Sequence, residues 1–244
     1  MNKVSIVGIG FRPLDRGARA AVLGSDVVLA NDRLREVFKG YEEYEAVKER
    51  IIVHGSVGEM LEYIDDHCRA RKIALLAAGD PMFFGIGHEV VERTGRDSVE
   101  VFPDLSSIQV AFARTRETSN SALLISLHGG PDPGRRRKLE HEVHELPALL
   151  ERHGKLAILT DRENSPSVIA SEIAGHPASG PSQPAVKMYV CEKLGYADER
   201  VTEGRPEDFS GGDFEHPNVV IIVREAGEAG LVTPPGTAEQ GTSA

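Results

Sequence analysis

Short apolar runs alternate with helical spacings along the first half of the chain. Val4–Ile9 is a run rich in β-branched residues that leads into glycines, which predicts a buried parallel strand followed by a tight loop. Val57–Arg71 carries apolar residues on one helical face and acidic residues on the other, which predicts an amphipathic helix. We predict further strands at Asp26–Leu29, Ile73–Ala77 and Val99–Phe102, and helices at Arg16–Leu23, at Gly87–Arg93 and from near Ser106.

The polar stretch Arg114–Ser121 has few large apolar residues and predicts an interdomain linker. The alternation then resumes, with strands expected at Ala122–Leu127, Lys155–Leu159, Ala185–Glu192 and Asn218–Val223, and helices around Leu139–Arg152 and Pro166–Ala174. These patterns predict the α/β class, with two α/β domains whose sheets are mainly parallel. We expect the domains at residues 1–113 and 122–225, the linker at 114–121 and a flexible tail at 226–244.

The net charge and the absence of several motifs argue against nucleic acid, metal and membrane as partners. The formal net charge of −10 argues against nucleic acid, because phosphate binding needs a basic face. Cys68 and Cys191 lie far apart and form no CxxC pair, and His141 and His144 do not complete a zincin pattern, so we predict no metal site. Neither a secretory signal nor a membrane span is indicated, and we expect a cytoplasmic protein.

Three loops follow predicted strands of the first half and carry the candidate chemistry. Gly8-Ile9-Gly10 would let backbone amides approach a ligand, although a structural turn is the simpler explanation of these two glycines taken alone. Pro13 stands where a dinucleotide fingerprint needs its third glycine, which disfavours a NAD site. Gly79-Asp80-Pro81 either places a carboxylate on the same sheet edge for a ligand or merely begins a helix. Ser106 and Ser107 either cap the next helix or bind a ligand at its amino end.

The order of these loops resembles the tetrapyrrole methylase family. Ser126-Leu127-His128-Gly129 and the stretch from Leu159 to Pro166 are similar to signatures of the branch that methylates C5 of cobalt-precorrin-7, as are Asp32-Arg33-Leu34 and Gly195–Arg200. The resemblance covers about Val4 to Arg224. The chain departs from the family pattern in having Phe11–Asp15 where Pro-Gly-Asp is common, and Pro103-Asp104 where Pro-Gly is usual.

This resemblance implies two α/β domains, an interdomain cleft that holds S-adenosyl-L-methionine, and a homodimer. Carried over position by position, it places the cofactor at Gly10, Phe11, Ala78, Gly79, Asp80, Phe83, Ser106, Ser107, Thr160 and Leu194. It places the macrocycle near His128, Asp161 and Asn164. It also implies a cobalt-precorrin or precorrin as substrate, and we expect the C15-methylating and decarboxylating activity on a separate protein.

Methyl transfer from a sulfonium disperses charge, so alignment should matter more than strong acid–base catalysis. We expect Asp80 to orient the cofactor or substrate, and His128 is a candidate proton acceptor, with a hydrogen-bonded loop histidine as the alternative. The substrate's carboxylates call for a cationic rim, for which Arg12 and Arg33 are candidates, with Arg16 and Arg114 beside them. Methylation at another ring position and a noncatalytic adenosine-binding module remain the alternative functions.

Overall fold

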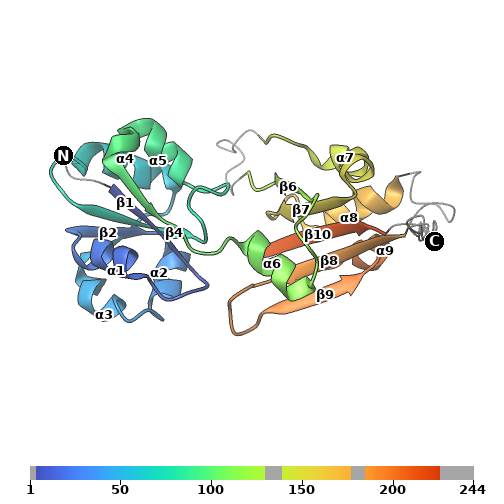
Figure 1. Cartoon of the computed structure of the whole chain (residues 1–244), viewed down its shortest axis with the longest axis horizontal. Coiled ribbons are helices and arrows are strands. Elements are labelled where there is room, and N and C mark those ends of the chain that lie inside the picture. The colour runs from blue at the N-terminus through green and yellow to red at the C-terminus, as the bar shows by residue number, and fades with distance from the viewer. Residues whose placement is uncertain (1–3, 130–138, 177–184, 226–244) are drawn as a thin grey trace, which may run out of the picture.

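Two sheets organise the chain, one in each half. The computed structural model describes residues 4–129, 139–176 and 185–225, and within them the strands form two five-stranded sheets. Figure 1 shows the two halves side by side, joined by the segment that contains α6 (Ser107–Thr115). The predicted tail at 226–244 lies outside the described residues.

The first sheet is entirely parallel, as the apolar runs predicted. Its strand order is β3-β2-β4-β1-β5, and every pairing is parallel. The strands are β1 (Val4–Ile9), β2 (Val27–Ala30), β3 (Ile51–Val53), β4 (Ile73–Ala78) and β5 (Val99–Phe102). Because parallel strands share one direction, the loops that follow β1, β4 and β5 leave the sheet at one edge.

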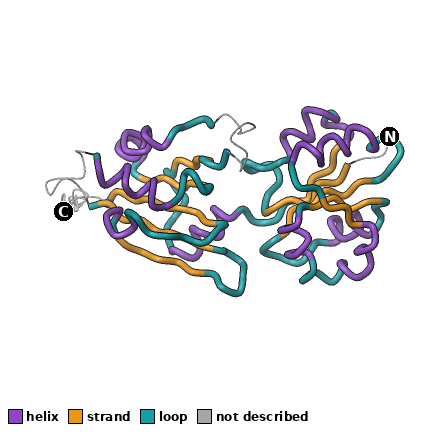
Figure 2. Tube along the Cα trace, turned by 180° about the vertical axis from the view of Figure 1, so that it is seen from behind, coloured by secondary structure: helices purple, strands orange, loops and turns teal. Residues whose placement is uncertain are grey.

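Helices cover both faces of this sheet (Figures 1 and 2). Ile64 of α4 and Val90 of α5 pack with Ile6 and Leu75 on one face, whereas Val22 of α1 and Phe38 of α2 pack with other strand residues on the opposite face. Each fully buried side chain of this kind contributes about 1.5–3 kcal/mol. The helices are α1 (Arg16–Leu23), α2 (Asp32–Phe38), α3 (Tyr44–Val47), α4 (Val57–His67) and α5 (Gly87–Thr94), with short 3-10 turns η1 (Lys48–Arg50) and η2 (Arg96–Ser98).

The elements α2, α3 and β3 were not predicted, because they are too short to show a clear period in the sequence. The helix predicted to reach Arg71 ends at His67, and the chain turns there before β4. The side chain of Asn31 accepts a hydrogen bond from the Leu34 amide and so fixes the beginning of α2 directly after β2.

The second sheet is mixed, which corrects the expectation of mainly parallel sheets in both domains. Its order is β6-β7-β10-β8-β9, and only the β6–β7 pairing is parallel. Its strands are β6 (Leu123–Ser126), β7 (Lys155–Leu159), β8 (Val186–Glu192), β9 (Arg200–Gly204) and β10 (Asn218–Arg224). The short connection from β8 to β9 allows an antiparallel pair, whereas a parallel pair needs a long crossover. β9 was missed because it is an exposed edge strand without an apolar run.

Helices also cover both faces of the second sheet. Leu150 of α7 (Leu146–His153), Ile169 of α8 (Pro166–Gly175) and Phe209 of α9 (Pro206–Phe209) pack in the core on one face. The predicted helix Leu139–Arg152 begins later than expected, with the 3-10 turn η4 (Val143–Glu145) and then α7. Pro147 lies in the first turn of α7, where its missing amide costs least.

Helix α6 packs on the opposite face of the second sheet. Its buried residues, which include Ile108 and Phe112, lie in one core with Tyr189 and Ile221. It runs to Thr115, into the segment expected as the linker, and ends at the left-handed residue Arg116. In the described part of the chain, no helix is long and apolar enough to cross a membrane.

Candidate functional site

The three candidate loops of the first half meet at the carboxyl edge of the parallel sheet. The Gly79 amide donates to the Ile9 carbonyl at 2.9 Å, and the Asp104 amide donates to the Gly79 carbonyl at 3.3 Å. A methyl group added at Gly8 would lie 2.0 Å from the Gly79 carbonyl oxygen, so only glycine permits this approach. The loops after β1, β4 and β5 therefore form one continuous surface.

The amides of the first loop are occupied by protein side chains. Gly10 N–H donates to the Tyr41 hydroxyl at 2.7 Å, and Phe11 N–H donates to Oδ2 of Asp104 at 2.7 Å. Arg12 N–H donates to the same oxygen at 3.2 Å, and Arg12 Nε donates to Oδ1 of Asp104 at 2.8 Å. Thus these three amides already have partners, which corrects the simple expectation that a glycine loop offers its amides to a ligand.

Neither Tyr41 nor Asp104 was a candidate from the sequence. Burial raises the pKa of Tyr41, and the nearby Asp104 carboxylate adds to this rise, although the bond from Gly10 opposes it. The hydroxyl therefore stays neutral at physiological pH. The sequence did hold one sign of this contact. The two departures from the family pattern, at Phe11–Asp15 and at Asp104, lie in the segments that bind each other.

Asp80 shapes the turn that follows β4. Its Oδ1 accepts the Met82 amide at 2.9 Å and its carbonyl accepts the Phe83 amide at 3.1 Å, which is the geometry of an Asp-Pro turn. Its side chain is half-buried, and Ala78 beside it is exposed at the end of β4. One carboxylate oxygen of Asp80 therefore holds this turn, but the turn does not begin a helix, because α5 starts only at Gly87.

The serine loop begins α6. Ser106 is the N-cap of that helix, and its hydroxyl accepts the Gln109 amide while the Gln109 side chain accepts the Ser106 amide at 2.9 Å. The expectation that one serine caps the helix is confirmed. Ser107 is half-buried in the first turn of α6.

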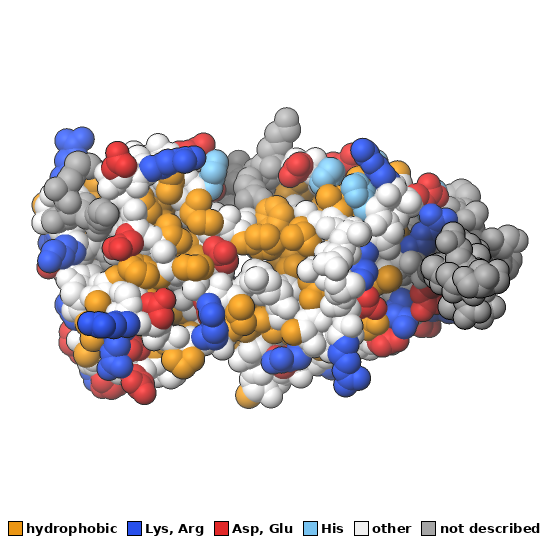
Figure 3. Space-filling model, viewed as in Figure 1, with side chains coloured by type: hydrophobic (Ala, Val, Ile, Leu, Met, Phe, Trp, Pro, Cys, Tyr) orange, Lys and Arg blue, Asp and Glu red, His pale blue; other side chains and the backbone are white. Residues whose placement is uncertain are grey.

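The loop between β8 and β9 brings the second half against the first loop. A methyl group added at Gly195 would lie 3.0 Å from both the Gly10 carbonyl oxygen and the Phe11 ring, and Arg33 donates to the Tyr196 hydroxyl at 3.2 Å. The rings of Phe11 and Phe83 pack against the core that contains Leu194. Figure 3 shows hydrophobic side chains gathered near the middle of the molecule, where the two halves meet.

The other predicted residues of the second half lie on loops at the matching edge of its sheet. Buried Asp161 accepts the amides of Gly129, Glu163 and Asn164, and the Asn164 side chain donates to the Leu127 carbonyl at 2.8 Å. The buried Thr160 hydroxyl bonds to Asn218. His128 is exposed. Thr160, Asp161 and Asn164 thus use these hydrogen bonds to fix the second half's own loops.

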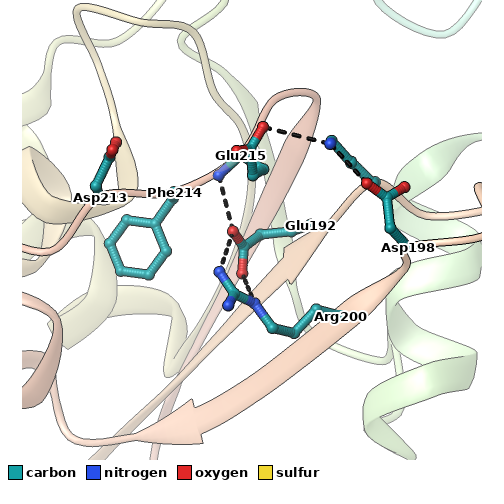
Figure 4. A pocket seen from close by; sticks show the side chains of 7 residues that line it. Glu192, Asp198, Arg200, Asp213, Phe214 and Glu215 are labelled. Carbon is teal, nitrogen blue, oxygen red and sulfur yellow. Dashed lines mark hydrogen bonds and ion pairs between the residues drawn. The ribbon is translucent and has the colours of Figure 1, made fainter.

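A polar pocket of about 330 Å³ lies beside these loops but includes none of the predicted site residues (Figure 4). Its lining residues are Glu192, Lys193, Asp198, Arg200, Asp213, Phe214 and Glu215. Glu192 receives two bonds of 2.7 Å from Arg200, and Lys193 pairs with Asp198 and Glu215. Burial raises the pKa of Glu192, but the hydrogen bonds from Arg200 and the Glu215 amide outweigh it and leave that pKa lowered. These ion pairs make the pocket part of the scaffold.

The structure also bears on metal binding and on the cationic rim. Among the residues that it describes, no group of three or more His, Cys, Asp or Glu side chains could hold a metal ion. Arg114 is paired with Glu199, which also accepts the Gly195 amide at 2.8 Å. Arg114, a candidate for the cationic rim, therefore holds the carboxylate that binds the β8–β9 loop.

Loops that meet at the carboxyl edge of a parallel sheet, as those after β1, β4 and β5 do, are typical of α/β proteins that bind small ligands. The chain belongs to the family Tetrapyrrole (Corrin/Porphyrin) Methylases, whose model matches residues 3–209. It is thus a methyltransferase that uses S-adenosylmethionine, and the predictions of the family, the enzyme class and the cofactor are confirmed.

Relatives and solved structures agree with this membership. A probable cobalt-precorrin-7 C(5)-methyltransferase of Methanocaldococcus jannaschii is 27% identical and covers 89% of this chain and 96% of its own. A cobalt-precorrin-7 C(5)-methyltransferase of Salmonella typhimurium is 30% identical over 71% of this chain and 77% of its own. The fold matches a uroporphyrin-III C-methyl transferase from Thermus thermophilus complexed with S-adenyl homocysteine, with TM-score 0.63, 20% identity, and coverage of 91% and 97%.

Proposed function

We propose that this protein transfers a methyl group from S-adenosylmethionine to C5 of cobalt-precorrin-7 in cobalamin biosynthesis. The observation that carries the proposal is the similarity, over most of the chain, to two relatives with this activity in their names. The convergence of the three first-half loops with Leu194 supports it, because these are the positions at which the resemblance puts the cofactor.

The residues around the first loop fit such a cofactor. The amides of Gly10, Phe11 and Arg12 are occupied, so this loop does not favour a phosphate-bearing dinucleotide. The space beside Gly10 is open, since no heavy atom lies within 4 Å of an added methyl there. The packed rings of Phe83 and Phe84 lie nearby on the second loop and offer apolar surface.

In this proposal the bound cofactor supplies an electrophilic methyl group, and the protein aligns it with a ring carbon. Gly10, Phe11, Ala78, Gly79, Phe83, Ser106, Ser107, Thr160 and Leu194 would contact the cofactor. Asp80 would orient it through the carboxylate oxygen that does not hold the turn. His128, which is exposed, would accept the proton that the ring loses.

The macrocycle would lie against the loops that carry His128, Asp161 and Asn164. Its carboxylates would meet Arg12, which is half-exposed beside Asp104, and Arg33, which reaches the second half through Tyr196. Both arginines lie near the junction of the halves, so an acidic protein would still present positive charge there. The homodimer, the cytoplasmic location and a separate C15-methylating and decarboxylating protein also stay predictions.

The test is anaerobic incubation of the purified protein with cobalt-precorrin-7 and cofactor labelled with ¹³C in the methyl group. We expect one new labelled carbon at C5, located by NMR of the product. A label at another ring position would remove the C5 assignment but keep the methyltransferase. Binding of S-adenosylhomocysteine without transfer to intact cobalt-precorrin-7 or to any related precorrin would instead favour the noncatalytic module.

A further inference from the structure

We propose that Asp104 is a positioning residue that holds the glycine loop ready for ligand, and that the backbone of this loop receives a hydrogen-bond donor group and rejects an anion. The inference rests on the proposed function in one respect, namely that this loop contacts the cofactor. It names the chemical character of the ligand group that the loop accepts.

The geometry centres on one buried carboxylate. Asp104 is 6% exposed and accepts hydrogen bonds on both of its oxygens. Oδ2 receives the amides of Phe11 and Arg12, while Oδ1 receives Arg12 Nε and the Leu105 amide, the last at 2.7 Å. Asp104 thereby ties the loop after β5 to a loop 92 and 93 residues earlier in the chain.

A carboxylate of this kind fixes a backbone conformation because every bond to it is charge-assisted. Tyr41 holds the preceding amide, of Gly10, so three consecutive residues are tied to the body of the domain. Gly10 itself has a φ of +135°, a conformation that L side chains rarely adopt. The loop is therefore set before any ligand arrives, which lowers the entropic cost of binding.

The same bonds decide which ligand groups the loop can accept. An anion would find none of these three amides available, and it would approach the negative charge of Asp104. The Arg12 side chain pairs with Asp104 and is 54% exposed, so it can meet an anion outside the loop without making the three amides available. A ligand amine, ammonium or hydroxyl group can instead donate to the loop's carbonyl oxygens, because those of Gly10, Phe11 and Arg12 accept no backbone amide of the described residues.

The first test uses amide hydrogen exchange together with calorimetry. Asp104→Asn keeps the volume but replaces one acceptor oxygen by a donor, and Asp104→Ala removes both oxygens. We expect the Phe11 and Arg12 amides to exchange at least about tenfold faster in both variants, while the amide of Val7 in β1 keeps its protection. S-adenosylhomocysteine should bind about 10- to 100-fold more weakly.

Asp65→Asn is the matched control. It breaks an exposed Asp–Arg pair with Arg93, also within the first half, whose N···O distance is 2.7 Å. Asp65 and Arg93 lie near the ends of α4 and α5, and helices that follow parallel strands run back toward the opposite sheet edge. Exchange of the Phe11 amide and ligand affinity should both stay at the wild-type values.

The second test concerns the charge of the ligand. Adenosine should bind the wild-type protein at least as tightly as adenosine 5′-monophosphate at equal ionic strength, and tighter binding of the monophosphate would overturn the rejection of anions. Unchanged exchange, or faster exchange with unchanged affinity, would overturn the positioning role of Asp104. Failure of the wild-type protein to bind S-adenosylhomocysteine would instead count against the proposed function.

Discussion

Replacing Gly8 by alanine adds one methyl group at the most crowded point of the candidate site. That methyl carbon would lie 2.0 Å from the Gly79 carbonyl oxygen and 2.6 Å from the Asp104 amide nitrogen, whereas ordinary contact begins at 3.4 Å. Both neighbours are backbone atoms, so neither can move aside by changing a rotamer. The loops after β4 and β5 must therefore separate from β1.

The magnitude follows from the contacts that this separation breaks. Overpacking of a well-packed site costs about 1–3 kcal/mol, and loss of the hydrogen bond from the Asp104 amide to the Gly79 carbonyl adds about 1 kcal/mol. The free energy of unfolding should fall by about 2–4 kcal/mol, which corresponds to about 5–15 °C in Tm for a chain of this size. Affinity for S-adenosylhomocysteine should fall more than tenfold, because the displaced loops carry the proposed cofactor contacts.

Urea denaturation and calorimetry measure the two effects, and Gly175→Ala provides the control. Gly175 ends α8, and an added methyl there meets no atom within 4 Å. This control should be as stable as the wild type or slightly more so, because alanine is the better helix former. A Gly8→Ala protein with wild-type stability and affinity would refute the close approach of the three loops.

Three further predictions concern the second half. Asp161→Ala removes an acceptor of three amides and should lower the free energy of unfolding by about 2–4 kcal/mol in urea denaturation; a loss below about 0.5 kcal/mol would contradict it. Because the pKa of Glu192 is lowered in the folded state, its contribution to stability is present above its ordinary value of 4.5 and is lost as the pH falls through the lower folded value. Glu192→Gln should therefore flatten the acid side of the stability profile, and an unchanged slope would argue against the pair with Arg200. Burial raises the pKa of Cys191 to about 12, so iodoacetamide at pH 8 should label it only after unfolding, while partly exposed Cys68 reacts in the native protein; mass spectrometry distinguishes the two.

One design recurs in both halves. Asp104 follows β5 and binds the loop after β1, while Asp161 follows β7 and binds Gly129 after β6. In each case a buried carboxylate at the end of one strand holds the loop that follows another strand of the same sheet. The loops of the proposed site are therefore held by two aspartates whose main bonds are to backbone amides.

Much of the architecture was predictable because burial leaves a local trace. The run Val4–Ile9 is one of the central strands, and the strands predicted near Ile73, Val99 and Lys155 all exist. The capping role of Ser106 was also predictable, because a serine that precedes a helix commonly accepts a hydrogen bond from an unpaired amide of the first turn. No such trace was left by α3, which is about one helical turn long, or by β9, which is an exposed edge strand without an apolar run.

Residue patterns alone were enough to assign the strands formed by apolar runs, the loops that follow them, and the family to which those loops belong. The antiparallel direction of three of the four pairings in the second sheet came from the fold, because an apolar run looks the same in either direction. The fold likewise brings Tyr41 and Asp104 to the amides of Gly10, Phe11 and Arg12, which donate hydrogen bonds to them. Those partners lie tens of residues away, and no local pattern records which distant side chain a backbone amide meets.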